Sequence, residues 1–306
     1  MDLRRLGLFV AVADHGTITA AARAEHLAQP AASLALRELE AEVGAALFVR
    51  TRTRAVLTPA GEALLGPARQ VLRDVVTAAA AVAAVTGLLA GRLDVVSLPS
   101  LEADPLAAFV GRFRSQHPSV AVHISSSAST SELVEQILSG DAEVGITDHR
   151  RGKRRGDPRD QADERLERVR VATQDLVAVS PPGSAGAGRP LAIRDLARLG
   201  LVVTPAGTSL RTVLDQALDE HGLHADVAVE SAQREALVPL VLAGAGTSIV
   251  PASTAERNAS HGIVVRPLMP RLRRDIVLVR RRGTASPAAI RFIELATRVA
   301  RSTIET

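Results

Sequence analysis

The chain has 306 residues, a formal charge of +4 and a sequence pI of about 10.8, with 46% apolar and 23% charged residues. This length and composition indicate two or three globular domains and exclude a disordered chain. The basic pI permits a polyanionic partner, and the absence of cysteine excludes disulfides, thiolate zinc sites and cysteine nucleophiles.

Two apolar segments resemble export or membrane signals but fit helices of a globular protein better. The stretch RRLGLFVAVADHG begins with basic residues, as a signal peptide does, yet its apolar run ends at Asp14 and follows a helical stripe. That stripe comprises Leu3, Leu6, Phe9, Val10 and Ala13. The second segment, Val75 to Ala90, is shorter than the ~20 residues that span a bilayer. We therefore expect a cytoplasmic protein without a membrane segment.

Residues 1–58 predict three short helices. The second helix spans about Thr19 to Glu25 with Thr17 as its cap, and Gly44 ends the third. In the third helix the predicted buried face is Ala32, Leu36, Leu39 and Val43, and the outward face is Gln29, Pro30, Ser33, Leu34, Arg37 and Glu40. Two short helices joined by a tight turn, with a polar outward face on the second, are typical of a helix-turn-helix domain.

An alternating segment follows the third helix and predicts a basic wing. In LFVRTRTRAVL, alternation places Arg50, Arg52 and Arg54 on one side, where guanidiniums suit phosphates or a narrow minor groove. Residues 1–60 contain seven arginines against six acidic residues. The domain as a whole is therefore nearly neutral, so DNA binding depends on local placement of charge.

The first sixty residues resemble the N-terminal signature of the LysR-type transcriptional regulators. The matching motifs are LxxFVAVA in the first helix, TAAA in the second, QPAxS at the start of the third, then LExEVGxxLFxR and LTxAGE. The resemblance implies a winged helix-turn-helix domain, a linker helix that pairs with its copy in a second subunit, and an effector domain. It also implies double-stranded DNA as a partner and a homodimer or homotetramer, with contact to RNA polymerase left open.

Two positions depart from the family pattern. Ala28 replaces the usual serine, so the third helix lacks a hydroxyl cap, a loss of about 0.5–2 kcal/mol. Leu34 stands where a longer polar residue is common. We assign Gln29 and Ser33 to base edges, Arg37 to a phosphate or guanine, and Leu34 to apolar contact with a thymine methyl. The alternative for Leu34 is packing against the second helix.

A long helix is predicted over residues 59–88. Thr58 and Pro59 form a start signal. Its wide apolar stripe exceeds what one small domain can bury, and consists of Leu64, Leu65, Ala68, Val71, Leu72, Val75, Val76, Ala79 and Val82. Pro67 should kink this helix because it removes a hydrogen bond. The segment around Gly87 and Gly91 is the expected hinge.

From residue 91 to 306 short apolar strands alternate with helices, which predicts α/β layers with parallel sheets. The strands are RLDVVSL, VAVHI, EVGITD, DLVAVS, LGLVVT, DVAVE, TSIVP and IVLVR. The family's effector domain is similar to a type 2 periplasmic-binding-protein fold with two lobes and two crossover strands. On that basis lobe one covers about 91–168 and 269–306, and lobe two about 169–268. The charged insertion 149–164 is either a solvated loop or an accessory DNA-backbone contact.

Hydroxyl-rich loops after three of these strands are the predicted effector site. Ligands of open α/β sheets bind at the carboxyl ends of strands, and helix N-termini there favour anions. The resemblance implies the same loops and a small carboxylate effector. Our candidates are Ser100, Ser129, Thr204, Thr208 and Ser209. For each of them a plain helix cap is the alternative.

No catalytic or metal motif is evident. The sequence lacks GxSxG, HExxH and GxGxxG, and His221 and His224 are expected to be surface or capping residues since no third ligand accompanies them. We expect no cofactor. The interpretation is a DNA-binding transcriptional regulator, with two alternatives: a small-molecule binding protein of the same two-lobed fold with weak DNA readout, and an enzyme built on two α/β lobes.

Overall fold

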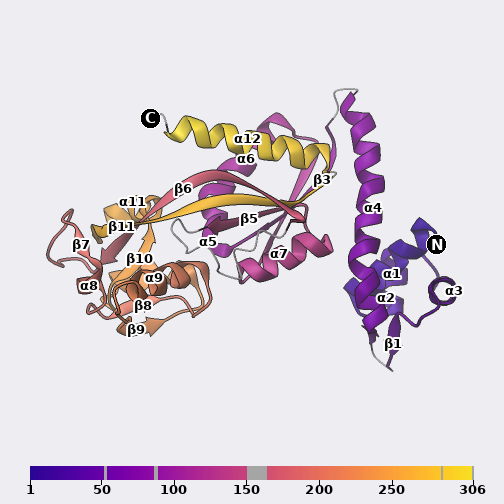
Figure 1. Ribbon diagram of the computed structural model, residues 1–306, viewed down its shortest axis with the longest axis horizontal. Helices are drawn as coiled ribbons and strands as arrows, with labels where there is room; N and C mark the ends of the chain where they lie inside the picture. Colours follow the sequence, from indigo (N-terminus) through magenta and orange to yellow (C-terminus); the bar gives the residue numbers. More distant parts are fainter. Residues whose placement is uncertain (52–53, 86–88, 150–163, 284, 305–306) are drawn as a thin grey trace.

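The computed structural model describes residues 1–51, 54–85, 89–149, 164–283 and 285–304. Three parts follow one another along the chain: an N-terminal helical domain, a long helix and a two-lobed α/β domain (Figure 1). Of the predicted hinge around Gly87 and Gly91, Gly87 lies outside the described residues and Gly91 begins β3, and residues 150–163 of the predicted insertion 149–164 also lie outside them.

The N-terminal domain has the predicted three helices and a hairpin. Its elements are α1 (Leu3–His15), α2 (Ile18–Ala24), α3 (Gln29–Val43), β1 (Phe48–Arg50) and β2 (Ala55–Leu57), with β1 and β2 antiparallel. Thr17 caps α2 by accepting a hydrogen bond from the Ala20 N–H at 3.1 Å, and Gly44 ends α3 at φ 78°. Ala28 precedes α3 without a side-chain cap, as predicted.

The buried faces of α1 and α3 differ in part from the predicted stripes. Leu8 and Val12 are buried in α1 while Leu3 is 42% exposed, and Val43 at the end of α3 is 41% exposed. The cause is that α1 contacts α2, α3 and also α4, so neighbours cover more of its circumference than one amphipathic stripe. The core includes Phe9 and Phe48, whose ring centroids lie 5.4 Å apart.

Helix α4 (Pro59–Val85) continues through Pro67 as one element. Its first half covers the N-terminal domain with Ala68 buried and Leu64, Leu65 and Leu72 partly buried. The rest of the predicted stripe is solvent-exposed, with Val76 63% and Val82 71% exposed. The helix also runs past α7 and α12 of the α/β domain (Figure 1).

The α/β domain is built on one seven-stranded mixed sheet and a smaller two-stranded sheet. One lobe contains β3 (Gly91–Ser97), α5 (Pro99–Leu101), α6 (Ala107–Gln116), β4 (Val120–Ser126), α7 (Thr130–Ser139), β5 (Val144–His149) and α12 (Pro287–Ile304). The other contains β7 (Leu191–Ala192), α8 (Ile193–Leu196), β8 (Leu201–Val203), α9 (Ser209–Asp219), β9 (Val227–Glu230), α10 (Leu237–Leu242), β10 (Ser248–Pro251) and α11 (Ala252–Asn258). Within the lobes β3 pairs in parallel with β4 and β5, and β8 pairs in parallel with β9.

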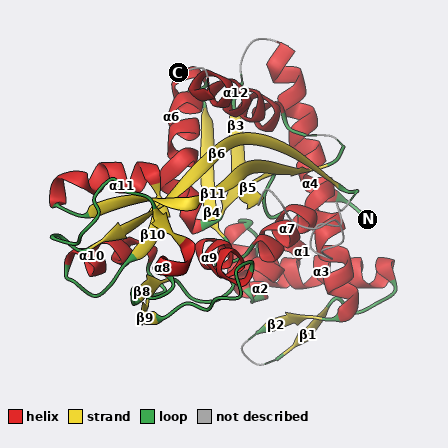
Figure 2. Ribbon diagram, turned by 60° about the vertical axis from the view of Figure 1, so that its left-hand side comes forward, coloured by secondary structure: helices red, strands yellow, loops and turns green. Residues whose placement is uncertain are grey.

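Two long antiparallel strands, β6 (Leu166–Ser180) and β11 (Val264–Arg281), join the lobes (Figure 2). They extend well beyond the predicted DLVAVS and IVLVR segments and pair antiparallel with β10 and β5, so the sheets expected to be parallel are parallel within the lobes and antiparallel along the crossover strands. The core of the first lobe includes Val171 and Ile276, whereas Leu176 and Leu272 belong to a core of the second. The strands therefore pass between lobes at about residues 172–175 and 273–275.

Two glycines in helices of the N-terminal region test this packing. A Cβ on Gly61 of α4 would lie 2.2 Å from the Leu47 carbonyl oxygen, whereas a Cβ on Gly7 of α1 would meet nothing within 4 Å. We expect Gly61→Ala to lower the free energy of unfolding by about 1–3 kcal/mol and the matched Gly7→Ala to raise it by about 0.5–1 kcal/mol. Urea unfolding followed by circular dichroism measures both. Equal effects would contradict the close approach of α4 to the Leu47 backbone.

Candidate functional site

The outward face of α3 carries the predicted recognition residues. Gln29, Pro30 and Arg37 are exposed, and the Gln29 side-chain amide donates to the Ser33 hydroxyl at 2.9 Å. Leu34 is 51% exposed, so about half of its surface is open to solvent on this face. The face therefore offers one amide, one hydroxyl, one guanidinium and one apolar side chain to the solvent.

The carboxylates of α3 are held away from that face. Arg5 of α1 pairs with Glu38 at 3.0 Å and with Glu42 at 3.2 Å. Glu40 was predicted to point outward, but its Oε1 accepts the backbone N–H groups of Leu47 at 2.9 Å and Phe48 at 3.3 Å. It is drawn inward because the wing leaves these donors unpaired within reach of the helix end. Acidic charge is thus neutralised or buried beside the recognition face.

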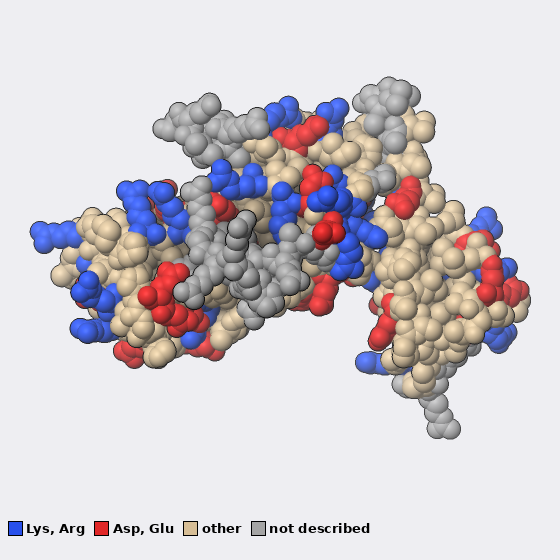
Figure 3. Space-filling model, viewed as in Figure 1, with Lys and Arg blue, Asp and Glu red and all other residues tan. Residues whose placement is uncertain are grey.

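The wing is a tight hairpin. Thr51 closes it by donating from its N–H to the Arg54 carbonyl at 2.8 Å, while its hydroxyl accepts from the Arg54 N–H at 2.9 Å. The alternation expected through Arg50, Arg52 and Arg54 stays a prediction, because residues 52–53 lie outside the described residues. Arg54 is exposed; Arg52 lies outside the described residues, as does the side chain of Arg50. Figure 3 shows basic and acidic side chains interspersed on this domain, consistent with its nearly neutral count.

A fully buried arginine occupies the place where the two lobes meet. Arg274 of β11 is 0% exposed and lies opposite Gln174 in the pairing of β11 with β6. Its Nε and Nη2 donate to Gln174 Oε1 at 3.0 and 2.7 Å. Its Nη1 donates to the hydroxyls of Ser100 at 3.1 Å and Ser209 at 2.7 Å, and contacts Asp148 Oδ2 at 3.4 Å. Every nitrogen of the buried guanidinium is satisfied, as its burial requires.

Further hydrogen bonds cross between the lobes around this guanidinium. The Ser209 hydroxyl donates to Asp148 at 2.5 Å, and Arg234 donates to the Ser100 carbonyl at 2.8 Å. Burial is the main cause that lowers the pKa of both the Arg274 and the Arg234 guanidinium, and nearby carboxylates oppose it. We call Arg274, Gln174, Ser100, Ser209 and Asp148 the cleft cluster. It holds the lobes together around one buried charge pair.

Of the predicted effector residues, the structure brings two into the cleft cluster. Ser100 and Ser209 contact Arg274 directly. Ser129 instead caps α7, accepting the Glu132 N–H at 3.2 Å, which is the plain capping role weighed from the sequence. Thr204 and Thr208 share a hydrogen bond of 2.7 Å before α9 and contact the cleft cluster through no described hydrogen bond.

The charged members of the cluster were missed by sequence reasoning. Arg274 belongs to RLRRD, and the sequence does not indicate which of its three arginines faces inward. Gln174 directly precedes the predicted strand DLVAVS. Asp148 ends the predicted strand EVGITD, a position at which a buried carboxylate could have been inferred from the strand-end rule. Pairing between β6 and β11 is what brings Gln174 and Arg274 together, and no local pattern indicates it.

Sequence comparison identifies both parts of the chain. Residues 3–62 match the family of bacterial regulatory helix-turn-helix proteins of the lysR family, and residues 86–301 match the LysR substrate binding domain. The chain belongs to the LysR family of transcriptional regulators. It is 32% identical over 273 residues to the regulator PtxR of Pseudomonas aeruginosa, covering 88% of this chain and 82% of PtxR. It is 28% identical to TcbR of Pseudomonas sp. P51, covering 96% and 97%.

Solved structures of the family agree with the fold. Full-length CbnR in complex with its target DNA matches with a TM-score of 0.66 and 27% identity, covering 97% of this chain and 99% of that one. A full-length variant of OxyR from Pseudomonas aeruginosa matches with a TM-score of 0.77 and 22% identity, covering 98% and 95%. This LysR-family regulator thus has an N-terminal DNA-binding domain and a two-lobed effector domain.

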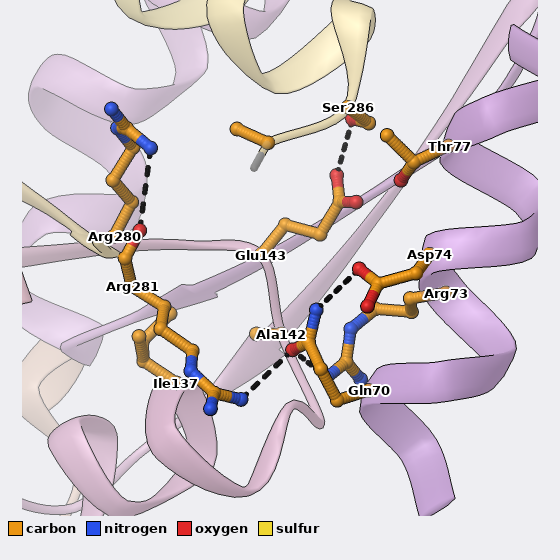
Figure 4. Close-up of a pocket in the computed structure, with 11 residues that line it drawn as sticks. Gln70, Arg73, Asp74, Thr77, Ile137, Ala142, Glu143, Arg280, Arg281 and Ser286 are labelled. Atoms are coloured by element: carbon orange, nitrogen blue, oxygen red, sulfur yellow. Dashed lines mark hydrogen bonds between the residues drawn. The ribbon is translucent and has the colours of Figure 1, made fainter. Parts of the chain in front are cut away.

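A polar junction ties the linker helix α4 of the regulator to the effector domain. Arg69 of α4 pairs with Asp14 of α1 and with Asp141 after α7, and Arg73 donates to the Gly140 carbonyl. Beside them Gln70 accepts from Arg281 at 2.9 Å (Figure 4). The cavity beside Gln70 and Glu143 has a volume of about 30 Å³, room for one water, whereas an open pocket of about 320 Å³ lies beside Arg69 and Asp141.

The described residues contain neither a candidate metal site nor a helix that could span a membrane. No group of three or more His, Cys, Asp or Glu side chains within them could hold a metal ion, and the His221 ring instead bonds the Ala217 carbonyl at 3.0 Å near the end of α9. Among these residues no helix is long and apolar enough to cross a membrane.

The junction predicts a pH effect on stability. Burial raises the pKa of Glu143, against the hydrogen bond from Ser286 at 2.7 Å and the nearby Arg73, with Asp94 adding to the rise. A raised pKa in the folded state means that stability falls as pH rises from the ordinary carboxyl range through the raised value. We expect Glu143→Gln to unfold at a higher temperature than the native chain at pH 8, with the difference shrinking toward pH 4. The exposed Glu135→Gln is the control; a difference independent of pH would contradict the prediction.

Proposed function

We propose that the protein binds operator DNA in the cytoplasm as a homodimer or homotetramer and changes transcription when a small metabolite with a carboxylate binds between the lobes. Lobe movement would alter the spacing of paired recognition helices, and hence DNA bending or contact with RNA polymerase. No enzyme activity is proposed, since the named relatives are transcriptional regulators.

The arrangement of α3 carries the DNA-binding part of the proposal. In this proposal Gln29 and Ser33 contact base edges and Leu34 contacts a thymine methyl. Arg37 contacts a phosphate or guanine, Pro30 contacts the same groove at the helix start, and the wing arginines Arg50, Arg52 and Arg54 contact phosphates or the minor groove. The engagement of Glu38, Glu40 and Glu42 elsewhere supports it, because carboxylates on the groove face would repel phosphates.

The exposed valines of α4 support self-association. Val75, Val76 and Val82 are 46%, 63% and 71% exposed. They continue, along the second half of the helix, the same stripe whose first half packs on the N-terminal domain. An apolar stripe of this kind gains stability when a second copy of the helix covers it. A homodimer through α4 would present two recognition helices to the two halves of an inverted repeat.

The cleft cluster supports effector binding. Ser100 and Ser209 supply hydroxyls from the two lobes to a buried guanidinium, a donor set that suits a carboxylate. Ser129, Thr204 and Thr208 remain proposed contacts at the neighbouring loops. The second candidate, a binding protein with weak DNA readout, is favoured only by the uncapped start of α3 at Ala28 and by the apolar Leu34.

The test is selection of genomic DNA fragments by the full-length protein, then a salt titration on the best fragment. A site with inverted symmetry, with affinity that falls steeply as salt rises, is expected. Failure to enrich any sequence, with and without candidate metabolites, would contradict the operator-binding proposal and favour a binding protein with weak DNA readout.

Two substitutions separate base contacts from phosphate contacts on the selected site. Gln29→Ala should reduce the preference for operator over random duplex by about 1–3 kcal/mol. Arg54→Ala should weaken both duplexes alike and lower the slope of log affinity against log salt by about 1 per chain. Fluorescence anisotropy titrations measure both. Equal losses from the two variants on operator and random DNA would refute this division of roles.

A further inference from the structure

The two charges of the cleft cluster, which form an ion pair, are also bridged by a hydroxyl that belongs to the second lobe. Ser209 accepts from Arg274 Nη1 at 2.7 Å and donates to Asp148 Oδ2 at 2.5 Å, while Arg274 and Asp148 themselves approach only to 3.4 Å. Asp148 lies on β5 of the first lobe, and Arg274 on the crossing segment of β11. The hydroxyl therefore acts as acceptor toward a cation and donor toward an anion at the same time.

Movement of the second lobe would remove that hydroxyl. Ser209 is the first residue of α9, so it moves with the second lobe, whereas Asp148 is held in the sheet of the first by its pairing with Ile276. Opening would leave Arg274 and Asp148 side by side without the group that lies between them. Such a pair exposes one cation and one carboxylate to whatever enters the cleft.

Building on the proposed function, we propose that the effector is a zwitterion, an α-amino acid or close analogue, whose carboxylate binds Arg274 and whose ammonium binds Asp148. The carboxylate takes the acceptor role of the Ser209 oxygen, with the Ser100 hydroxyl as a second donor. The ammonium takes the donor role of the Ser209 O–H. Each replacement turns a hydrogen bond between an ion and a neutral hydroxyl into a hydrogen bond between two ions of opposite charge, which adds an ion-pair attraction.

Charge balance distinguishes this ligand class from simpler ones. A carboxylate without an ammonium would lie against Asp148 with no cation between the two anions, since the next guanidinium, Arg234, lies beyond Ser100, and this placement is unfavourable. An amine without a carboxylate would place a second cation beside Arg274, which is unfavourable for the same reason. A zwitterion leaves the net charge of the cleft unchanged. The cleft cluster presents only hydroxyl, amide, guanidinium and carboxylate groups, so we expect a polar side chain.

The experiment measures ligand binding to the full-length native protein by calorimetry. The protein L-amino acids are titrated singly, and each one that binds is compared with its des-amino carboxylate and its decarboxylated amine. We expect at least one amino acid to bind and both counterparts to bind more than about 30-fold more weakly, the scale of loss when one partner of a buried charge pair is missing. Equal binding of the des-amino carboxylate, binding of a neutral polyol instead, or no binding by any amino acid would overturn the proposal.

Variants assign the two charges. Asp148→Asn should remove most of the preference for the amino acid over its des-amino counterpart, and Arg274→Gln should remove carboxylate binding. Arg273→Gln is the matched control: this neighbour on β11 is exposed and pairs with Asp175, so binding should be unchanged. Because the native-protein titration needs no variant, it remains decisive if Arg274→Gln fails to fold. Operator selection without amino-acid binding would refute this inference alone, whereas loss of both would refute the proposed function.

Discussion

A guanidinium that is shielded from water must be surrounded by oxygen acceptors, and Arg274 obtains them from both lobes of the effector domain. The cost of removing its charge from water makes the positions of Ser100, Ser209 and Gln174 interdependent, because displacing one leaves a buried donor unpaired. Asp148 supplies the opposite charge at the end of β5. Hydrogen bonds from this single side chain therefore contribute to the relative placement of the lobes.

Strand β5 connects the cleft to the linker helix. Asp148 lies near its end in the cleft cluster, and Glu143 lies directly before its start, beside α4. Arg69 then joins the same region to Asp14 of the DNA-binding domain. One short strand and one set of polar contacts thus lie between Asp148 and the DNA-binding domain. A change in the partners of Asp148 can reach that domain through them. This route gives a physical basis for coupling an effector to DNA.

Local patterns in the sequence predicted the parts whose structure is determined locally. The three helices, the Thr17 cap, the Gly44 terminus and the short apolar strands follow from periodicity and capping alone. The first half of β6 and most of β11 were missed because charged residues face solvent along them and prolines interrupt β11. Ser100 and Ser209 were found from the strand-end rule, whereas Arg274 and Gln174 depend on pairing across about a hundred residues of sequence. The orientation of Glu40 likewise depends on the wing, not on the helix that contains it.

The measurement that tests the central role of the buried pair most directly is a double-mutant cycle of Arg274→Gln and Asp148→Asn, followed by urea unfolding of the full chain. If the buried pair stabilises the cleft cluster, each single change destabilises the effector domain by about 3–5 kcal/mol and the double change costs clearly less than the sum. Additive losses would show that the two side chains act independently, and would contradict the central role of this pair in the cleft cluster.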